Sequence, residues 1–444
     1  MPKIEQMKKD FGERTIVIWG ARMTGLGALR QCRSAGILPV AFIDSDPAFK
    51  GKTVANLPVF SPAEFWAKLT QFIKPAVLIA VSLKEDEIRS QILAQGSSGI
   101  SIFSFHDASS PYYTVDVLGS CNLSCRSCPH SIEAHGVPKG SMELSTFKQV
   151  FNKIVLESPG ISHLSLYSWG EPLLHPYIAD IVEYVHSMDV AVALSSNLSI
   201  RFESRIEALI QQAPDYLKVS VSGYYQDIYG STHQGGDVNL VKSNLYRLRH
   251  LIDKYNSGTL VDINYHLYRN NNGVNLEMFR RLADELGFIM SETYALVMPL
   301  ERVINHLDGK PDLQTQLLKD NLLVTIDEGI EASSVQRLRD GYCPFRENQV
   351  NINADLTVPV CCTVFHRNGT IVANNFLNTD ADTIRANKTR VELCNRCTKL
   401  ALPEYNLGLN HAGWDVFARE KQSTDDGNQT QQGYMIATST HGVV

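Results

Sequence analysis

Short apolar runs alternate with amphipathic segments along most of the chain, and this alternation predicts an α/β protein. Near the start, the apolar runs 15–20 and 38–44 flank a helical pattern over 21–36 that ends at a glycine. A strand, a helix and a second strand in this order predict a βαβ unit with two parallel strands. We therefore expect a first domain over residues 1–110.

The glycines of this first unit lie where a dinucleotide-binding loop keeps them. Gly20, Gly25 and Gly27 occupy the turn and the helix start, but Arg22 replaces the middle glycine of G-x-G-x-x-G. Asp44 ends the second strand, at the position of a ribose-binding acid. The segment resembles the small Rossmann-like domains attached to sugar-modifying and sugar-nucleotide enzymes. A docking or oligomerisation module without a ligand is the alternative, and Arg22 could either meet a phosphate or block close approach of one.

Residues 111–310 continue the alternation, and about six strand–helix units predict a partial (β/α)6 TIM-like barrel. The expected strands lie within 113–119, 162–168, 190–199, 216–223, 261–268 and 293–299, and the expected helices within 141–155, 177–188, 202–213, 238–252 and 275–287. Barrel enzymes place their active sites at the carboxyl ends of the strands. Residues that follow the strands are therefore the candidates for function.

Three cysteines follow the first of these strands at C-x3-C-x2-C spacing: Cys121, Cys125 and Cys128. A cubane cluster has four irons that each need an external ligand, so three thiolates leave one iron open for chemistry. A zinc site completed by His130 is the alternative, and a disulfide is disfavoured because the number is odd. The spacing resembles the signature of radical S-adenosylmethionine (radical SAM) enzymes. That resemblance implies a [4Fe–4S] cluster whose open iron binds S-adenosylmethionine and cleaves it reductively to a 5'-deoxyadenosyl radical.

Polar residues end the next strands and are candidate cofactor-binding residues. Trp169, Gly170, Glu171 and Pro172 resemble the Gly-Gly-Glu motif of the family, which holds the methionine amino group, although Trp169 replaces the first glycine. The other candidates are Ser195, Ser196 and Asn197 at the end of the third strand, and Lys218, Ser220 and Ser222, which alternate along the fourth and so point the same way. Of Tyr265 and His266, only one can face inward, and Asn271 and Asn272 have a turn as their ordinary interpretation. Solvated polar residues are the alternative for each position.

A second group of cysteines, Cys343, Cys361, Cys362, Cys394 and Cys397, lies in the expected third domain, 311–418. The order is a cysteine, a hairpin over 351–360, Cys-Cys, a spacer and C-x2-C, which resembles the SPASM-type domain of radical SAM enzymes. The resemblance implies an auxiliary [4Fe–4S] cluster on Cys343, Cys361, Cys394 and Cys397. Cys362 is then a packed thiol, a hydrogen-atom donor in catalysis, or the ligand in place of Cys361. Structural zinc is the alternative for the whole group.

Composition narrows the function classes. The net charge is −6, so nucleic acid is not an expected partner, and no apolar run is long enough to span a bilayer. The charged start lacks a signal-peptide core, which indicates a cytoplasmic protein whose nine cysteines stay reduced and serve mainly as metal ligands. Residues 419–444 are poor in apolar side chains, and we expect them to be disordered.

These patterns together predict a radical SAM enzyme of oxidoreductase or epimerase type. The first domain favours a sugar or nucleotide-sugar as substrate, and an external electron donor such as flavodoxin or ferredoxin is implied by the resemblance. Peptide modification, as in enzymes that mature ribosomal peptides, is the alternative within the class. A non-catalytic zinc-binding protein is the alternative from another class.

Overall fold

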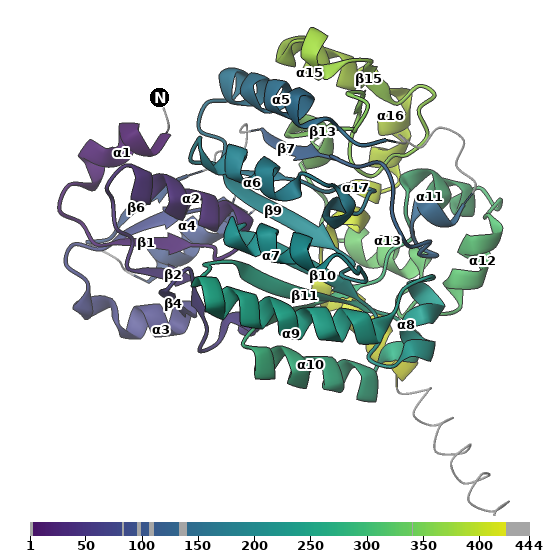
Figure 1. Cartoon of the computed structure of the whole chain (residues 1–444), viewed down its shortest axis with the longest axis horizontal. Helices are drawn as coiled ribbons and strands as arrows, with labels where there is room; N and C mark the ends of the chain where they lie inside the picture. Colours follow the sequence, from purple (N-terminus) through teal and green to yellow (C-terminus); the bar gives the residue numbers. More distant parts are fainter. Residues whose placement is uncertain are drawn as a thin grey trace, which may run out of the picture.

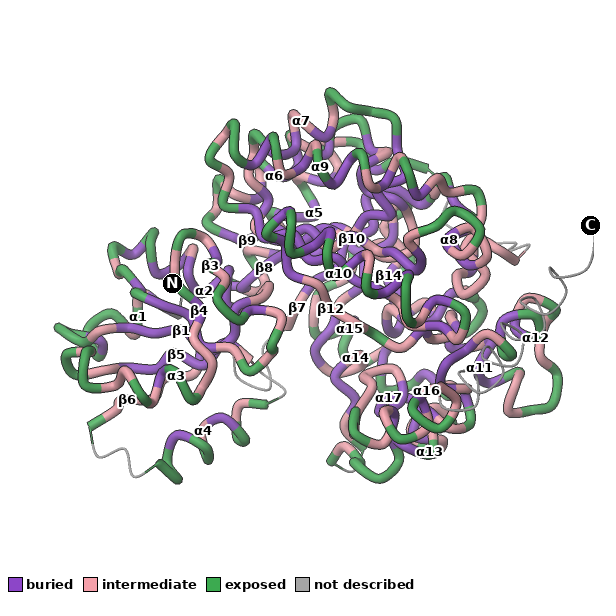
Figure 2. Tube along the Cα trace, turned by 90° about the horizontal axis from the view of Figure 1, so that it is seen from below, coloured by how far each residue is buried: buried purple, intermediate pink, exposed green. Residues whose placement is uncertain are grey.

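The computed structural model describes residues 3–81, 84–95, 99–105, 111–132, 140–339 and 341–422. Within these residues the chain forms an N-terminal sheet, a larger central sheet and a mostly helical C-terminal part (Figure 1). The N-terminal domain lies to one side of the central sheet, and the C-terminal part covers another side (Figure 2). The residues expected to be disordered from 423 onward lie outside the described part of the chain.

The N-terminal sheet has six strands in the order β3-β4-β2-β1-β5-β6, parallel except for the β3–β4 pair. The unit β1-α2-β2 has the strand–helix–strand order that the sequence predicts, and β1 is buried along its whole length. The strands are β1 (Ile16–Trp19), β2 (Ala41–Ile43), β3 (Thr53–Val54), β4 (Leu57–Phe60), β5 (Ala76–Ile79) and β6 (Ser101–Ser104); the helices are α1 (Lys3–Phe11), α2 (Met23–Ser34), α3 (Pro62–Ala67) and α4 (Glu85–Ala94).

The central sheet has seven strands, all parallel, in the order β12-β11-β10-β9-β8-β7-β13. Its strands are β7 (Tyr112–Val115), β8 (His163–Ser165), β9 (Ala191–Ser196), β10 (Tyr216–Val221), β11 (Leu260–Leu267), β12 (Ile289–Tyr294) and β13 (Gln349–Ile352). The connecting helices are α5 (Leu144–Glu157), α6 (Ile178–His186), α7 (Glu203–Gln211), α8 (Gln226–Thr232), α9 (Val238–Tyr255) and α10 (Val274–Leu286). The fold is α/β, and its first six central strands form the expected partial TIM-like barrel.

Two expected elements, one in the barrel and one in the third domain, were wrong. The sixth strand covers 289–294 rather than 293–299, because the residues that pair with β11 begin at Ile289. The expected hairpin over 351–360 is not formed either, although a turn closes between Asn353 and Thr357 (2.9 Å). β13 leaves that turn to pair with β7, whereas β14 (Val358–Pro359) pairs with β15 (Ile371–Ala373).

The N-terminal domain closes the amino-terminal end of the barrel strands. α2 packs on β8 and β9, and a Cβ at Gly27 would lie 2.1 Å from the carbonyl oxygen of Ser162, so the helix comes close only because this residue is glycine. Arg22 ion-pairs with Asp46 (2.7 Å) and with Asp262 of β11 (3.4 Å). The residue at the missing glycine position therefore links the two domains.

Helices α11 (Leu300–Leu307), α12 (Leu313–Lys319), α13 (Ile326–Ser334), α14 (Pro344–Glu347), α15 (Ala381–Lys388), α16 (Glu392–Lys399) and α17 (Leu402–Leu407) build the C-terminal part. A last helix runs over 411–422, so the expected disorder is wrong for 419–422. This helix is anchored because Trp414 is 1% exposed and Lys421 ion-pairs with Glu328 of α13. No helix in the described part of the chain combines the length and apolarity needed to span a membrane.

Candidate functional site

The loop 121–128 follows β7 and is fixed by the segment 231–236, which ends α8. Two backbone hydrogen bonds join them, from Ser124 N–H to Gln234 O (2.9 Å) and from Arg126 N–H to Thr232 O (3.2 Å). Each cysteine therefore projects from a backbone held on both sides of Cys125. The sequence analysis did not anticipate this support.

The three thiols of this loop are partly buried. Burial is the main cause that raises the pKa of Cys121 to about 12 and that of Cys128 to about 11, and it raises the pKa of Cys125 well above its usual value. The other two cysteines of the loop add to the shift of Cys125. Cys121 Sγ also accepts from Leu123 N–H (3.4 Å) and Asn197 Nδ2 (3.7 Å). Thiolates here need a positively charged partner, which a metal centre supplies.

His130, the fourth ligand of the zinc alternative, is directed elsewhere. Its Nε2 lies 2.9 Å from the carbonyl oxygen of Trp169. Among the residues that the structure describes, no group of three or more His, Cys, Asp or Glu side chains is arranged to hold a single metal ion.

The loop after β8 lies directly against the cysteine loop. Glu171 N–H donates to Ser120 O (2.9 Å), and a Cβ at Gly170 would lie 1.5 Å from the carbonyl oxygen of Leu118. Asp116 accepts from Trp169 N–H (3.2 Å) and Gly170 N–H (3.4 Å). The two strand ends are thus joined through backbone groups, and only glycine fits at position 170.

Asp116 was missed by the sequence analysis. It is 3% exposed, and burial is the first cause that raises its pKa to about 7. Its place directly after the strand, two residues from Thr114 and three before Gly119, was a usable signal, since an acid at the inner end of a barrel strand needs a partner.

The Glu171 side chain ties β8 to β9. It is 2% exposed and accepts from Leu173 N–H (3.0 Å) and Asn197 N–H (2.8 Å). Burial raises its pKa to about 7 against the effect of these hydrogen bonds. Pro172 follows as the first residue of a short 3₁₀ turn that Glu171 caps. The carboxylate therefore positions the loop, and the backbone of that loop is what a ligand could meet.

Pairing registers place Ser195, Lys218, Ser220 and His266 on the inner face of the barrel. Lys218 pairs with Ser195 of β9, and Ser220 pairs with Asn264 of β11, two residues before His266. Lys218 Nζ lies 5.2 Å from the centroid of the Tyr167 ring. The structure thus brings these predicted residues into one lumen.

Other predicted polar residues serve the scaffold. Tyr265 faces outward and packs on Phe279 (5.7 Å), while Asn271 donates to the carbonyls of Ser222 and His266 (both 2.7 Å). Ser222 is buried and shares a hydrogen bond with His233 Nδ1 (2.6 Å). A turn was the correct interpretation for Asn271.

Four of the five C-terminal cysteines line one small cavity: Cys343, Cys361, Cys394 and Cys397. Cys362 is not among its lining residues. Its backbone N–H donates to Gln349 Oε1 (3.4 Å), and Gln349 pairs with Tyr112 at the start of β7. Burial raises the pKa of the Cys362 thiol to about 12.

A buried lysine tests whether a metal–thiolate group fits this cavity. Lys388 is 3% exposed and donates to the carbonyl oxygen of Gln349. Burial lowers its pKa to about 8, and the groups that oppose this are Cys361, Cys362, Cys343 and Cys394. A buried ammonium needs a counter-charge, and no carboxylate ion-pairs with Lys388 in the described residues. Metal-bound thiolates would provide that charge, so the residues fit an anionic cluster.

Comparison with known proteins places the central domain. Residues 115–283 match the Radical SAM superfamily. Among solved structures, anSMEcpe with bound AdoMet aligns at a TM-score of 0.44 and 14% identity, covering 71% of this chain and 99% of that one. BtrN with AdoMet and 2-DOIA aligns at a TM-score of 0.35 and 14% identity, covering 65% of this chain and 89% of that one. Streptococcus suis SuiB bound to S-adenosylmethionine aligns at a TM-score of 0.42 and 10% identity, covering 67% of this chain and 68% of that one. A search of curated proteins returned no match. Residues 115–283 of the chain are a radical SAM domain.

Proposed function

We propose that the chain is a radical enzyme that holds a [4Fe–4S] cluster on Cys121, Cys125 and Cys128 and uses it to cleave S-adenosylmethionine. One observation carries the proposal: the matched domain contains three partly buried thiols on a single loop, and the Glu171 N–H to Ser120 O hydrogen bond fastens that loop to 169–172. When bound, the cluster supplies the electron that releases a 5'-deoxyadenosyl radical, which removes hydrogen from the substrate.

The residues of the chain prepare the place for that reaction. Asp116 and Glu171 hold the 169–171 backbone, so its carbonyl groups keep a fixed direction toward a bound amino group. Ser195, Lys218 and Ser220 supply polar groups in the lumen. Asn197 donates to Cys121 and fixes the position of its sulfur. Such support keeps reacting atoms in place and water out, which a radical intermediate requires.

The second cavity is proposed to hold an auxiliary [4Fe–4S] cluster on Cys343, Cys361, Cys394 and Cys397. Lys388 supports an anionic group there, and the lining supports Cys361 over Cys362 as ligand. The geometry does not favour the catalytic role considered for Cys362, because this thiol lies by the start of β7 whereas Cys121 follows its end. Structural zinc, the alternative for these cysteines, has less support, because no three of the described His, Cys, Asp or Glu side chains are arranged to hold a single metal ion.

For the substrate we propose a sugar or nucleotide-sugar that is oxidised or epimerised, with a flavodoxin or ferredoxin as the electron donor. The Rossmann-like order of the N-terminal domain supports this class. A cavity of about 460 Å³ lies where β1, β2 and β5 end. Peptide modification is the alternative, and anSMEcpe with a Cp18Cys peptide and SuiB with its precursor peptide SuiA are among the structures found.

The test is anaerobic purification of the full chain, followed by iron and sulfide counts and an assay for 5'-deoxyadenosine. Two cubanes require about eight irons per chain. Cys125→Ala should lose about four of them and all 5'-deoxyadenosine, while Cys32→Ala, at a buried thiol of the N-terminal domain, should keep both. Zinc in place of iron, or full turnover by Cys125→Ala, would refute the proposal.

A further inference from the structure

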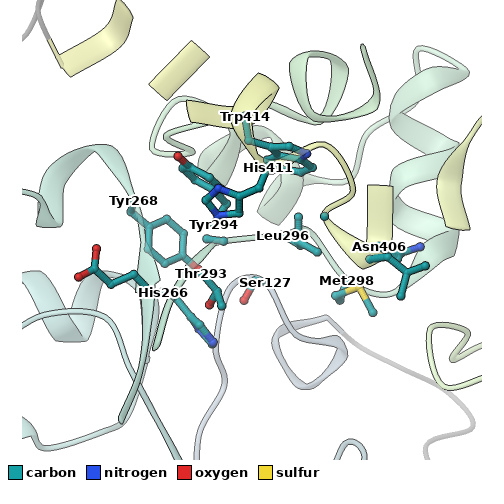
Figure 3. Close-up of a pocket in the computed structure, with 14 residues that line it drawn as sticks. Ser127, His266, Tyr268, Thr293, Tyr294, Leu296, Met298, Asn406, His411 and Trp414 are labelled. Carbon is teal, nitrogen blue, oxygen red and sulfur yellow. The ribbon is translucent and has the colours of Figure 1, made fainter. Parts of the chain in front are cut away.

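A pocket of about 400 Å³ opens beside the cysteine loop, where the ends of β11 and β12 meet α17 and the helix 411–422. Figure 3 shows His266, Thr293 and Ser127 on one side of it and His411 and Trp414 on the other. β12 is the edge strand of the central sheet, so the pocket lies at the open side of the incomplete barrel.

The pocket reaches the place where radical chemistry would begin. Ser127 lies between Cys125 and Cys128, and its carbonyl accepts from Met298 N–H (3.0 Å). The Ser127 side chain hydrogen-bonds with Tyr268, another lining residue. A group bound here therefore lies against the loop that carries the three thiols.

One wall of the pocket is an aromatic stack. Tyr294 stacks on Trp414 (5.6 Å between centroids, 21°), and Trp414 stacks on Tyr405 (5.6 Å, 25°). His411 tilts over Tyr294 at 5.4 Å, and the Tyr294 hydroxyl is fixed by Asp415 (2.5 Å). Such rings offer a rigid apolar surface with little conformational entropy to lose on binding.

The polar groups of the pocket are uncharged or already paired. Burial lowers the pKa of His266 to about 4, so this imidazole is neutral at pH 7. Thr293 donates to Asn264 Oδ1 (2.9 Å) and keeps a hydroxyl oxygen that can accept. Glu292 is bound by Arg280 at 2.7 and 2.9 Å.

Asn406 offers a further acceptor. Its Oδ1 is buried and has no hydrogen-bond partner in the part of the chain that the structure describes. No lysine or arginine is found among the described residues that line the pocket, so a phosphate or carboxylate would find no cation there.

We propose that this pocket binds the reacting part of the substrate and that this part is a neutral polyhydroxylated ring, such as a pyranose. The apolar C–H face of the ring lies on the aromatic wall, and its hydroxyl groups meet Thr293, His266 and Asn406. Any phosphate on the substrate stays outside the pocket. The inference rests on the proposed function and deepens it by separating a sugar ring from a peptide and from a phosphorylated group.

Saturation-transfer NMR on the anaerobic holoenzyme tests the inference with three sets of probes: a panel of methyl pyranosides, the matching pyranose 6-phosphates, and acetylated dipeptide amides. We expect at least one neutral pyranoside to bind, and its phosphate to bind more weakly. Thr293→Val and His411→Ala should each weaken binding about threefold to tenfold. His250→Ala, at an exposed position of α9, should leave it unchanged.

The inference is overturned if no pyranoside binds, if the phosphates or dipeptides bind better, or if both pocket variants bind as the wild type does. Iron content and slow 5'-deoxyadenosine release without substrate are measured on the same samples. Loss of pyranoside binding with these two intact refutes the pocket alone, whereas their absence in the wild type refutes the proposed function.

Discussion

Gly170→Ala tests the contact between the two strand-end loops. The new Cβ would lie 1.5 Å from the carbonyl oxygen of Leu118 and 2.7 Å from its carbonyl carbon, and these backbone atoms cannot rotate away. The 169–171 loop must therefore move off the cysteine loop. Three hydrogen bonds are at risk: Glu171 N–H to Ser120 O, and Trp169 and Gly170 N–H to Asp116.

Losing all three would cost about 4 kcal/mol of unfolding free energy, since two of them involve a carboxylate. Misplacing the loop by about 1 Å should also lower 5'-deoxyadenosine formation about 100-fold. Urea denaturation and a single-turnover assay measure the two effects. Gly258→Ala is the matched control, because nothing lies within 4 Å of its Cβ position. A Gly170→Ala protein with wild-type stability and turnover would refute the described contact.

Three further predictions concern other buried groups. Lys388→Met should lower the reduction potential of the auxiliary cluster in a redox titration, because a buried cation favours the reduced form of the cluster. Lys399→Met, at an exposed position, should leave this potential unchanged. Asp116 has a folded pKa of about 7, above its ordinary value of 3.8, so the stability it contributes is fully present below about pH 4 and is lost as pH rises through about 7. Asp116→Asn should reduce the drop in unfolding free energy between pH 5 and pH 8, measured by urea denaturation at each pH. An unchanged drop would contradict this assignment to Asp116. Cys361→Ala should lose about four irons and Cys362→Ala none, by iron analysis; equal loss would overturn the choice between them.

The sequence predicted what depends on local periodicity. Apolar alternation located five of the six barrel strands, and the cysteine spacing located the loop that the structure fixes after β7. The sixth strand was misplaced because the polar residues Ser291 and Glu292 interrupt the apolar pattern, whereas the apolar residues 295–298 lie beyond the pairing with β11. Pairing register, rather than hydrophobicity, decides where that strand ends.

Features that join distant segments could not be predicted. Nothing near Gln349 in the sequence indicates that β13 pairs with Tyr112. The position of Arg22 suggested a phosphate contact, but its partner Asp262 lies 240 residues away in another domain. Likewise, Lys388 became informative only when the fold brought it beside the C-terminal cysteines.

The central claim is that Cys121, Cys125 and Cys128 leave one iron open for S-adenosylmethionine. Electron paramagnetic resonance of the dithionite-reduced protein tests it most directly, with spectra taken before and after S-adenosylmethionine is added. The account predicts a cluster signal that changes on addition and that is missing from Cys125→Ala. A signal that stays the same when S-adenosylmethionine is added, or that persists in Cys125→Ala, would contradict it.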